Sequence, residues 1–502
     1  MDIAVLERPL PPADLVVVGS GIAGCEVAVR LARRGHRVVL VESGRQDFDP
    51  RVQALNDVVH RGKEHRSLDP AAPYHRYLDP GLRGVSRVRR LGGTSSVWTG
   101  KWKHLQRSDL DDRPWVPESG WPLDFDTDLL PHYRSAARDY GFGDLEAEAR
   151  RPAVQEIGER LAQHGLKASS FYWEERPTRT AERFGVDMRT SSDLVVLVGA
   201  TATEVLVEDD GEDVVATGVR CRSLEGHEAL VEGRRVVLAA GALETARLLL
   251  ASGPARAGGL GNAGDLVGRF YTDHPKHHTG RLHPGPLAAR FATELQYGPK
   301  PRFCLCFSLD DATQRREELL EHVVYLQPTY ERRRDRLRRA WRPPAARDGN
   351  GAVRDYRVKF AAEQAPHRAS RVQLGQDRDA LGQRVLEVDW QLTDHDARSM
   401  ARTVELLEER LHACGLGTLD FGDDPPSPES TTDAAHQMGT TRMAARAQDG
   451  VVDTDCRVFG VEGLYVAGSA VFPTGPSYSP TFTVLALARR LADHLAAVPA
   501  RR

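Results

Sequence analysis

The stretch that most constrains the fold is LVVVGSGIAGCEVAVRLARRGHRVVLVES, which begins at Leu15. An apolar run leads into a glycine turn, a helix-like stretch follows, and a second apolar run ends at Glu42. Gly19 permits a tight turn, Gly21 lets the backbone approach a pyrophosphate, and Gly24 lets the helix pack close to the strand. The glutamate can accept hydrogen bonds from ribose hydroxyls. An incidental GxGxxG in a loop would lack these neighbours, so the stretch predicts a Rossmann-type unit that binds a dinucleotide.

Two later stretches repeat the strand, turn and helix. In RRVVLAAGALETARLLLAS, an apolar run at Val236–Ala239 precedes a turn at Gly241. Near the C-terminus, an apolar run at Leu464–Ala467 leads through a Gly-Ser turn to a helix over about 481–495. Apolar residues at helical spacing give that helix a face that packs inward. A small-residue turn followed by a helix N-terminus presents backbone N–H groups to an anion. These units predict an α/β fold whose strands belong to one sheet.

Between residues 271 and 430 the pattern changes to alternating strands. Five such stretches, which suit one larger antiparallel sheet, are CLCFSL, HVVYLQPTY, DYRVKFAAE, RVQLG and RVLEVDWQL. A helical stretch over 394–415 closes the region. We therefore predict a discontinuous Rossmann-type domain formed by residues 1–270 and 431–502, with a surface excursion at about 45–90. Residues 271–430 are predicted to form an α+β substrate-binding domain.

Composition excludes several classes of protein. The chain has 502 residues, a net charge of −3 and a pI near 6.7, so no electrostatic feature favours nucleic acid or an anionic membrane. Its apolar runs are strand-length, too short to span a bilayer. The start, MDIAVLERPLPPAD, lacks the basic and apolar parts of a secretion signal. Six scattered cysteines form neither a disulfide framework nor a paired metal motif. We expect free thiols and a cytoplasmic location.

Three polar stretches allow both a functional and a plain structural interpretation. RRLGGTSSVWTGKW contains two glycines that permit close backbone approach, but alone it reads most simply as a loop without a ligand. Eight arginines in ERRRDRLRRAWRPPAARDGNG could bind phosphate, although the near-neutral net charge favours a solvated helix followed by a loop. His274, His277 and His278 lack carboxylate or cysteine partners at metal-binding intervals. We expect them to have a structural or surface role, and we expect no metal site.

Taken together, these segments resemble the glucose-methanol-choline (GMC) oxidoreductase family. The resemblance covers the N-terminal glycine unit, LGGTSSVWTG, VVLAAGALETARLLLAS and GNAGDLVGRFYTDHP. It also covers the C-terminal block HQMGTTRM…RVFGVEGLYVAGSAVFPTG…SPTFTVLALARRLADHL, which is the most specific part. The amino-acid sequence of that block looks most similar to the sugar-oxidising branch around pyranose oxidase. The resemblance implies an FAD-dependent enzyme that oxidises alcohols.

The resemblance also implies which residues bind FAD. They are Gly19, Gly21, Gly24, Glu42, Gly92, Gly93, Thr94, Ser95, Ser96, Val97, Val205, Gly468, Ser469, Pro480 and Thr481. The backbone of Val205 would meet the adenine, and the loop over 91–99 would run beside the isoalloxazine. Val97 stands where some relatives carry a histidine bonded to FAD, so the resemblance implies non-covalent FAD.

Two catalytic positions follow from the same resemblance. His436 matches the histidine of the HxxGTxRM motif, which acts as the base at the flavin. The family's second position carries Asn or His before a proline, whereas this chain has Ser479 there. Serine can hydrogen-bond a substrate hydroxyl but cannot act as a base. A neutral imidazole suits removal of a hydroxyl proton because its pKa lies near working pH.

The leading hypothesis is therefore FAD-dependent oxidation of a hydroxyl of a sugar, amino sugar, aminoglycoside or related polyol. Its partners would be a small-molecule alcohol and an electron acceptor such as oxygen. An alternative is a lyase of the same fold that keeps FAD without redox chemistry, as a hydroxynitrile lyase does. A third possibility is a non-catalytic binding protein on the same scaffold.

Overall fold

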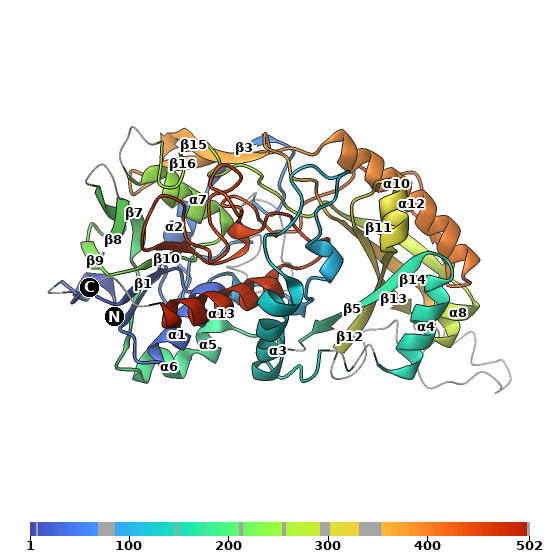
Figure 1. The fold of residues 1–502 in the computed structure, drawn as a ribbon, viewed down its shortest axis with the longest axis horizontal. Helices are drawn as coiled ribbons and strands as arrows, with labels where there is room; N and C mark the ends of the chain where they lie inside the picture. Colours follow the sequence, from blue (N-terminus) through green and yellow to red (C-terminus); the bar gives the residue numbers. More distant parts are fainter. Residues whose placement is uncertain are drawn as a thin grey trace.

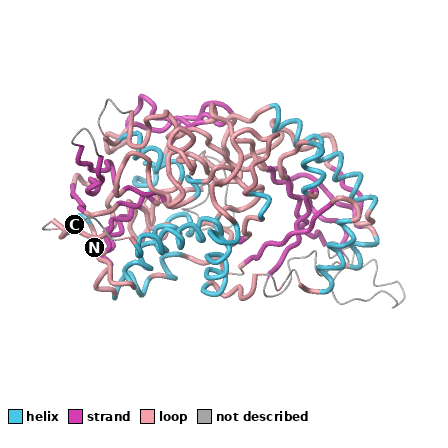
Figure 2. Tube along the Cα trace, in the orientation of Figure 1, coloured by secondary structure: helices cyan, strands magenta, loops and turns pink. Residues whose placement is uncertain are grey.

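A computed structural model describes residues 1–6, 9–68, 86–145, 147, 150–174, 176–209, 214–253, 258–291, 302–330 and 353–498 of the chain. Figure 1 shows an elongated molecule with a parallel sheet toward one end and a large antiparallel sheet toward the other. Loops fill much of the region between the two sheets (Figure 2). This arrangement confirms the predicted combination of a Rossmann-type α/β part and a second part with a large antiparallel sheet.

Five short strands form the parallel sheet, in the order β18-β10-β1-β2-β6. They are β1 (Leu15–Val18), β2 (Val38–Val41), β6 (Leu194–Leu197), β10 (Val236–Leu238) and β18 (Leu464–Val466). Continuous apolar runs are typical of parallel strands that are covered on both faces. The three predicted strand–turn–helix units therefore contribute neighbouring strands, although the units lie far apart in the sequence.

Helices cover both faces of this sheet. On one side α1 (Ile22–Ala32) packs against α13 (Thr481–Ala497), and α13 also contacts α3 (Leu130–Asp139). Figure 1 shows α7 (Ala242–Ala251) on the opposite side. A buried ion pair joins the packed helices, with Arg489 Nε on α13 2.7 Å from Glu26 Oε1 on α1. Leaving either charge unpaired would be strongly destabilising, so the pair fixes how the two helices meet.

Seven strands form the antiparallel sheet, in the order β17-β11-β14-β13-β12-β5-β4. They are β4 (Lys101–Trp102), β5 (Leu166–Trp173), β11 (Lys276–Pro284), β12 (Arg302–Leu309), β13 (His322–Tyr330), β14 (Val353–Ala362) and β17 (Gly417–Asp420). One face packs on α12 (Asp394–Ala413), where Leu326, Phe360 and Leu407 share one apolar cluster. Since β4 and β5 precede residue 271, the sheet draws on both sides of the predicted boundary, and the division into domains stays a proposal.

One part of the strand prediction is wrong. RVQLG and RVLEVDWQL do not join the large sheet; they form β15 (Arg371–Arg378) and β16 (Arg384–Trp390) of a separate three-stranded sheet. Its third strand is β3 (Val58–Gly62), from the surface excursion, which pairs parallel to β16. Alternation specifies a half-buried strand but not its neighbours. Packing determines which sheet these two strands join, because their apolar face lies against α7 and Tyr271.

The remaining elements are small. A fourth sheet, which is antiparallel, contains β7 (Thr201–Asp209), β8 (Val214–Arg222) and β9 (Glu228–Glu232). The other helices are α2 (Pro50–Gln53), α4 (Pro152–Ala162), α5 (Thr180–Arg183), α6 (Gly185–Thr190), α8 (Pro286–Arg290) and α10 (Asp311–Glu317). The arginine-rich run over 331–351, predicted as a solvated helix followed by a loop, lies entirely outside the described residues.

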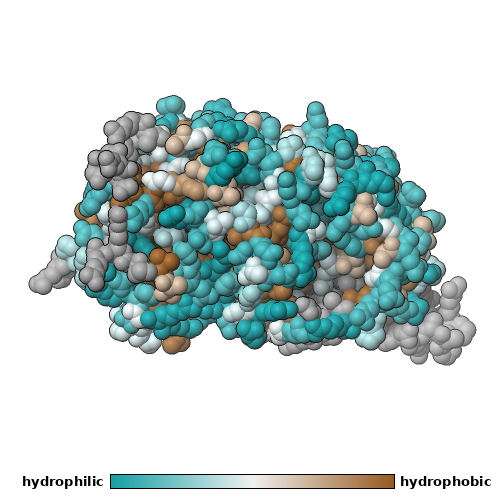
Figure 3. Space-filling view, viewed as in Figure 1, coloured by the Kyte–Doolittle hydropathy of each residue, from teal (hydrophilic) through white to brown (hydrophobic). Residues whose placement is uncertain are grey.

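The surface in Figure 3 is mostly hydrophilic, with small apolar patches. Within the part of the chain that the structure describes, no helix is both long and apolar enough to cross a membrane.

Candidate active site

A cavity of about 700 Å³ lies where the carboxyl ends of the parallel strands meet the seven-stranded sheet. Three turns contribute to its wall: Gly19–Gly21 after β1, Ala239–Gly241 after β10, and Ala467–Ser469 after β18. Side chains from β4, β11, β13 and β14 line the other side. Ligands of open parallel sheets bind outside the carboxyl ends of the strands, so this cavity is in the expected place for a cofactor.

The glycines of the first turn differ in what they face. Gly19 has a φ of +100°, and a Cβ there would lie 2.6 Å from the Ala239 carbonyl oxygen. A Cβ on Gly24 would lie 1.9 Å from the Gly19 carbonyl oxygen, so this residue serves helix packing and does not line the cavity. A Cβ on Gly21 would meet no protein atom within 4 Å. Only the last of these leaves space beside the uncapped N-terminus of α1 for an approaching anion.

Glu42 lies at the end of β2 and lines the cavity. Its carboxylate accepts hydrogen bonds from the Ser20 N–H at 3.0 Å, from Ser20 Oγ at 2.6 Å and from the Gly44 N–H at 2.9 Å. The Gly92 N–H in turn donates to Ser20 Oγ at 2.9 Å. The carboxylate therefore orients the first turn and ties the second glycine loop to it.

The second glycine loop packs directly across from the first turn. Gly93, Thr94, Ser95 and Val97 line the cavity, whereas Gly92 and Ser96 do not. A Cβ on Gly93 would lie 3.0 Å from the Gly21 Cα, so the two loops approach each other closely. Val97 is buried, and its position offers no nucleophile for a covalent bond.

The structure places Val205 away from the cavity. Its side chain is buried, and its N–H donates to Ser252 Oγ at 2.8 Å. The residues of this segment that line the cavity are Ala200, Thr201 and Ala202, at the start of β7. The strand passes the cavity only at its first residues, so the assigned position is several residues too far along the chain.

The C-terminal block supplies the remaining predicted residues. Gly468 and Ser469 line the cavity after β18, and Ser479, Pro480 and Thr481 line it where α13 begins. No side chain caps this helix, so its first N–H groups face the same space as those of α1. Ser469 Oγ donates to the Gln437 carbonyl at 2.7 Å, which joins this turn to the segment that carries the predicted base.

His436 lines the cavity beside His274, with ring centroids 4.9 Å apart in an edge-to-face arrangement. Its Nδ1 is buried and has no hydrogen-bond partner among the described residues. Burial lowers the pKa of this imidazole well below 6.5, and the nearby His274, Lys276 and Lys101 lower it further. The ring is therefore neutral at physiological pH and able to accept a proton.

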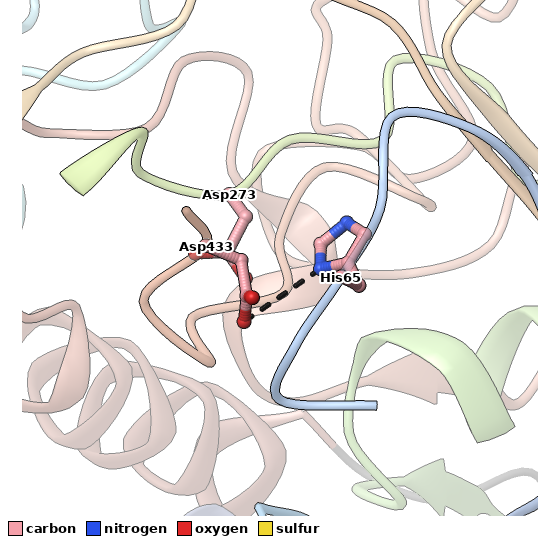
Figure 4. A group of neighbouring side chains, drawn as sticks. All are labelled: His65, Asp273 and Asp433. Atoms are coloured by element: carbon pink, nitrogen blue, oxygen red, sulfur yellow. Dashed lines mark ion pairs between the residues drawn. The ribbon is translucent and has the colours of Figure 1, made fainter. Parts of the chain in front are cut away.

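Asp273 and Asp433 form a buried acidic pair beside His65 (Figure 4). This pair holds the backbone at His436. Asp273 accepts hydrogen bonds from the N–H groups of His274 at 2.6 Å, Ala434 at 3.0 Å and His436 at 2.9 Å. Its partner Asp433 accepts from the Ala435 N–H at 3.1 Å. Ala435 has a φ of +59°, which is unusual for a residue with a side chain. The carboxylates thus hold a strained turn immediately before the histidine.

His65 completes this cluster. Its Nδ1 lies 3.7 Å from Asp433 Oδ2, and its Nε2 lies 3.1 Å from the Tyr271 hydroxyl. Donor atoms of His65, Asp273 and Asp433 lie within 4.8 Å of one another, a grouping that also suits a cation. All four carboxylate oxygens of the two aspartates, however, already accept backbone hydrogen bonds. These contacts identify the cluster as a support for the turn before His436.

Asp273→Asn is expected to lower kcat by about 10- to 100-fold without loss of FAD, because the amide cannot accept all three N–H bonds that fix the turn. Steady-state kinetics and the flavin content of the purified variant measure the two effects. Asp396→Asn is a matched control, since Asp396 is a buried carboxylate that caps the distant helix α12. A control that lost as much kcat as the Asp273 variant would contradict this assignment.

The sequence did not lead us to predict the side chains with which the seven-stranded sheet lines the cavity. Lys101, Lys276, His278, Tyr325 and Lys359 all line the cavity. For DHPKHH we expected a structural or surface role, yet His274 packs against His436 and His278 lines the cavity. Alternation along β11 was the available signal, because Lys276 and His278 are two residues apart and share a face of the sheet.

Comparison with protein-family models gives three matches. The FAD binding domain model matches residues 14–47, and two GMC oxidoreductase models match residues 150–276 and 366–488. Together the matches cover more than half of the chain and include the first glycine turn, α7 and most of the C-terminal block.

Individual relatives are distant. The chain is 23% identical to 2-methyl-1,2-propanediol dehydrogenase of Mycolicibacterium austroafricanum, over 96% of this chain and 95% of that protein. It is 25% identical to (R)-mandelonitrile lyase 1 of Prunus serotina, over 56% of this chain and 52% of that protein. Among solved structures, pyridoxine 4-oxidase from Mesorbium loti superposes with a TM-score of 0.58 at 20% identity, covering 97% and 100% of the two chains.

The cavity suits the cofactor that these matches indicate. Open space at Gly21, two uncapped helix N-termini and the carboxylate of Glu42 fit the phosphates and ribose of a dinucleotide, and the same cavity reaches His436. FAD is the cofactor, and the activity class is FAD-dependent oxidation of alcohols. On the family-model matches and the fold together, the chain belongs to the GMC oxidoreductase family.

Proposed function

We propose that the enzyme oxidises one hydroxyl-bearing carbon of a sugar, amino sugar or related polyol to a carbonyl, with His436 as the base. The observation that carries this proposal is the neutral, buried imidazole at the cavity wall, held by Asp273 in the cavity that accommodates FAD. The similarity to a diol dehydrogenase and the fold shared with pyridoxine 4-oxidase support a small hydroxylated substrate. None of the reported relatives is named for a sugar. Membership of the sugar-oxidising branch is therefore a proposal that rests on the sequence of the C-terminal block.

When bound, FAD accepts the hydride that leaves the alcohol carbon. His436 takes the hydroxyl proton on an imidazole nitrogen, so proton and hydride leave the substrate and a carbonyl remains. Ser479 Oγ lies 3.3 Å from Thr481 Oγ1 at the start of α13, where it can orient a substrate hydroxyl. A hydroxyl group has no accessible basic form near neutral pH, so its role is positioning.

Among the described residues, different parts of the cavity wall would hold different parts of FAD. Gly19, Gly21 and Glu42 would hold the ribose and pyrophosphate, with Gly468, Ser469, Pro480 and Thr481 on the opposite side. Gly93, Thr94, Ser95 and Val97 would lie along the ring system. Gly24 and Gly92 act through the backbone geometry of their turns. The absence of a histidine at residue 97 supports non-covalent binding.

The pH dependence follows from the neutral imidazole. Since the pKa of His436 is lowered, the base stays deprotonated as pH falls through 6.5, the ordinary histidine value. We expect kcat/KM for the alcohol to show no acid limb near that pH and to fall only at distinctly lower pH. A pH–rate profile measured with saturating electron acceptor tests this. An acid limb centred at 6.5 would contradict it.

An anaerobic titration of the FAD-loaded protein with sugars, amino sugars and diols tests the function itself. Loss of the oxidised-flavin band with one compound class, and formation of a carbonyl product, would establish alcohol oxidation. Re-admitting air would then show whether oxygen serves as the electron acceptor. The partial similarity to a mandelonitrile lyase keeps a non-redox lyase as the alternative. A lyase would convert a cyanohydrin while the flavin stayed oxidised throughout.

A cytoplasmic location and the lack of nucleic-acid or membrane partners belong to the same proposal. They are supported by the near-neutral net charge and by five cysteines that the structure shows as buried free thiols.

A further inference from the structure

The segment that carries Ser479 has no regular secondary structure. Residues 473–479 form neither helix nor strand, and they lead into α13, which begins at Thr481. Residues 473–478 are buried, whereas Ser479 lines the cavity. Pro480 follows directly, and a residue before proline is restricted to extended backbone. The direction of the Ser479 side chain therefore depends on how the residues before it are held.

Ser477 is held by a buried carboxylate. Its Oγ donates to Glu321 Oε2 at 3.0 Å, and both residues are buried. The Glu321 N–H donates to Glu363 Oε2 at 2.9 Å, and Lys167 Nζ lies 3.2 Å from Glu321 Oε1. Burial raises the pKa of Glu321, but the charges of Lys167 and Lys103 lower it more, so the carboxylate stays ionised. The bond from Ser477 is therefore charge-assisted, which makes it stronger than a bond between neutral groups.

Tyr478, the residue directly before Ser479, is held at its hydroxyl and at its ring. The hydroxyl donates to Asp109 Oδ2 at 2.5 Å. Burial and the nearby carboxylates raise the pKa of Tyr478 well above its ordinary value, so the hydroxyl stays protonated and remains the donor. Lys103 Nζ lies 3.7 Å from the centre of the ring and donates to Ser169 Oγ at 2.8 Å. An ammonium group over a ring face attracts it, so both ends of this side chain are fixed.

These supporting groups do not belong to the cavity wall. Asp109, Glu321 and Lys103 are not among the described residues that line the cavity, and neither is Tyr478. They therefore contact neither the substrate nor FAD in this arrangement. Buried ion pairs contribute little net stability compared with apolar side chains, whereas their directional bonds can specify one geometry. The geometry that these bonds specify is that of the two residues before Ser479.

We infer that Glu321 and Asp109 are positioning residues for the reaction, which hold Ser477 and Tyr478 so that Ser479 Oγ stays at the cavity wall and orients the substrate hydroxyl. This inference rests on the proposed function and deepens it. Both carboxylates act through Ser479, and neither exchanges a proton with the substrate.

Double-mutant cycles with Ser479→Ala test the inference in the FAD-loaded protein. Tyr478→Phe removes one hydroxyl and keeps the ring, and Glu321→Gln removes the charge and keeps the shape. Each is expected to slow anaerobic flavin reduction, by the alcohol that bleaches the flavin, about threefold to tenfold. Once Ser479 is alanine, the same change should cost less than about twofold, because no hydroxyl is left to misplace. Losses that multiply independently, or single variants with the wild-type rate, would overturn the inference.

Tyr172→Phe is the matched control for these cycles. Tyr172 also donates a buried hydroxyl, to the Leu145 carbonyl at 3.0 Å, and it does not line the cavity. Its loss should leave flavin reduction unchanged in both backgrounds. Since Tyr478→Phe and Glu321→Gln probe separate contacts, misfolding of one variant leaves the other to decide.

Crystal structures of the FAD-loaded variants give a readout that needs no turnover. Ser479 Oγ lies 3.3 Å from Thr481 Oγ1 in the wild type. In Tyr478→Phe and Glu321→Gln, we expect this side chain to leave that position or to divide between conformers, while the glycine turns stay in place. Ser479 in its wild-type position in both variants would overturn the inference.

The outcomes also separate this inference from the function on which it rests. A displaced Ser479 in both variants, without bleaching of the flavin by any alcohol, would support the positioning contacts and contradict alcohol oxidation. Bleaching by an alcohol, with independent losses in the cycles and an undisplaced Ser479, would support alcohol oxidation and contradict the positioning role.

Discussion

Replacing His436 with alanine is expected to lower kcat/KM for the alcohol by about 10²- to 10⁴-fold, the usual contribution of a positioned base. The imidazole is the neutral, buried ring at the cavity wall, and its loss removes the group that we propose takes the hydroxyl proton. FAD binding should be unchanged, because the histidine lies in the loop before β18 and not in the glycine turns. Anaerobic stopped-flow reduction and the flavin content of the variant separate the two effects.

His283→Ala is the matched control for this experiment. His283 is exposed on β11 and does not line the cavity, so its loss should leave flavin reduction at the wild-type rate. Ser479→Ala should cost about tenfold or less, as expected for one hydrogen bond to a substrate hydroxyl. Wild-type reduction rates in the His436 variant would contradict its role as the base.

The second large effect concerns the first glycine turn, where two substitutions should fail for different reasons. Gly24→Ala places a Cβ 1.9 Å from the Gly19 carbonyl oxygen, so helix and strand must move apart and the fold itself is expected to suffer. Gly21→Ala meets no protein atom within 4 Å, and its backbone is not in the left-handed region. The Gly21 variant should therefore fold normally but bind FAD at least about tenfold more weakly, through steric exclusion of the phosphates.

Thermal unfolding with and without added FAD distinguishes the two cases. The Gly21 variant should keep the Tm of the apoprotein but lose most of the rise in Tm that FAD causes. The Gly24 variant should show a lowered Tm in both conditions or no folded protein. Gly158→Ala in α4, where a Cβ also meets nothing within 4 Å, should stabilise the helix by about 0.5–1 kcal/mol. A Gly21 variant with unchanged FAD affinity would contradict the placement of the phosphates.

The parallel sheet could be predicted from the sequence because local signals determine it. Leu15–Val18, Val236–Leu238 and Leu464–Val466 are apolar runs, and each is succeeded by a small-residue turn and a helix. This pattern specifies the strand together with its turn and helix. The carboxyl ends of neighbouring parallel strands meet at one edge, so the turns could be expected to meet in one site.

The strands of the larger sheet were harder to predict, because the sheet that a strand joins depends on contacts with residues far away in the sequence. Nothing in the alternation of β15 and β16 reveals that Val372 and Val388 pack on Tyr271 and Leu243 rather than extend the seven-stranded sheet. The position of Val205 was misplaced for a related reason, since a strand meets a cavity over only a few of its residues.

The lysines on the sheet side of the cavity could not be identified from the sequence, for a different physical reason. Lys101, Lys276 and Lys359 are far apart in the chain and occur singly, so no local charge run indicates them. Only the order of β4, β11 and β14 in the sheet, together with the side-chain alternation along each strand, brings them to one face. Motifs indicated the activity class, whereas the side chains on the sheet side of the cavity could be identified only from the three-dimensional arrangement.

The most direct measurement is an anaerobic single turnover of the FAD-loaded enzyme with the alcohol that bleaches it. Flavin absorbance and product are quantified in the same sample, for the wild type and for His436→Ala. The expected result is one carbonyl formed for each FAD reduced in the wild type, and a greatly slowed reduction in the variant. Conversion of substrate while the flavin stays oxidised would contradict alcohol oxidation at this site.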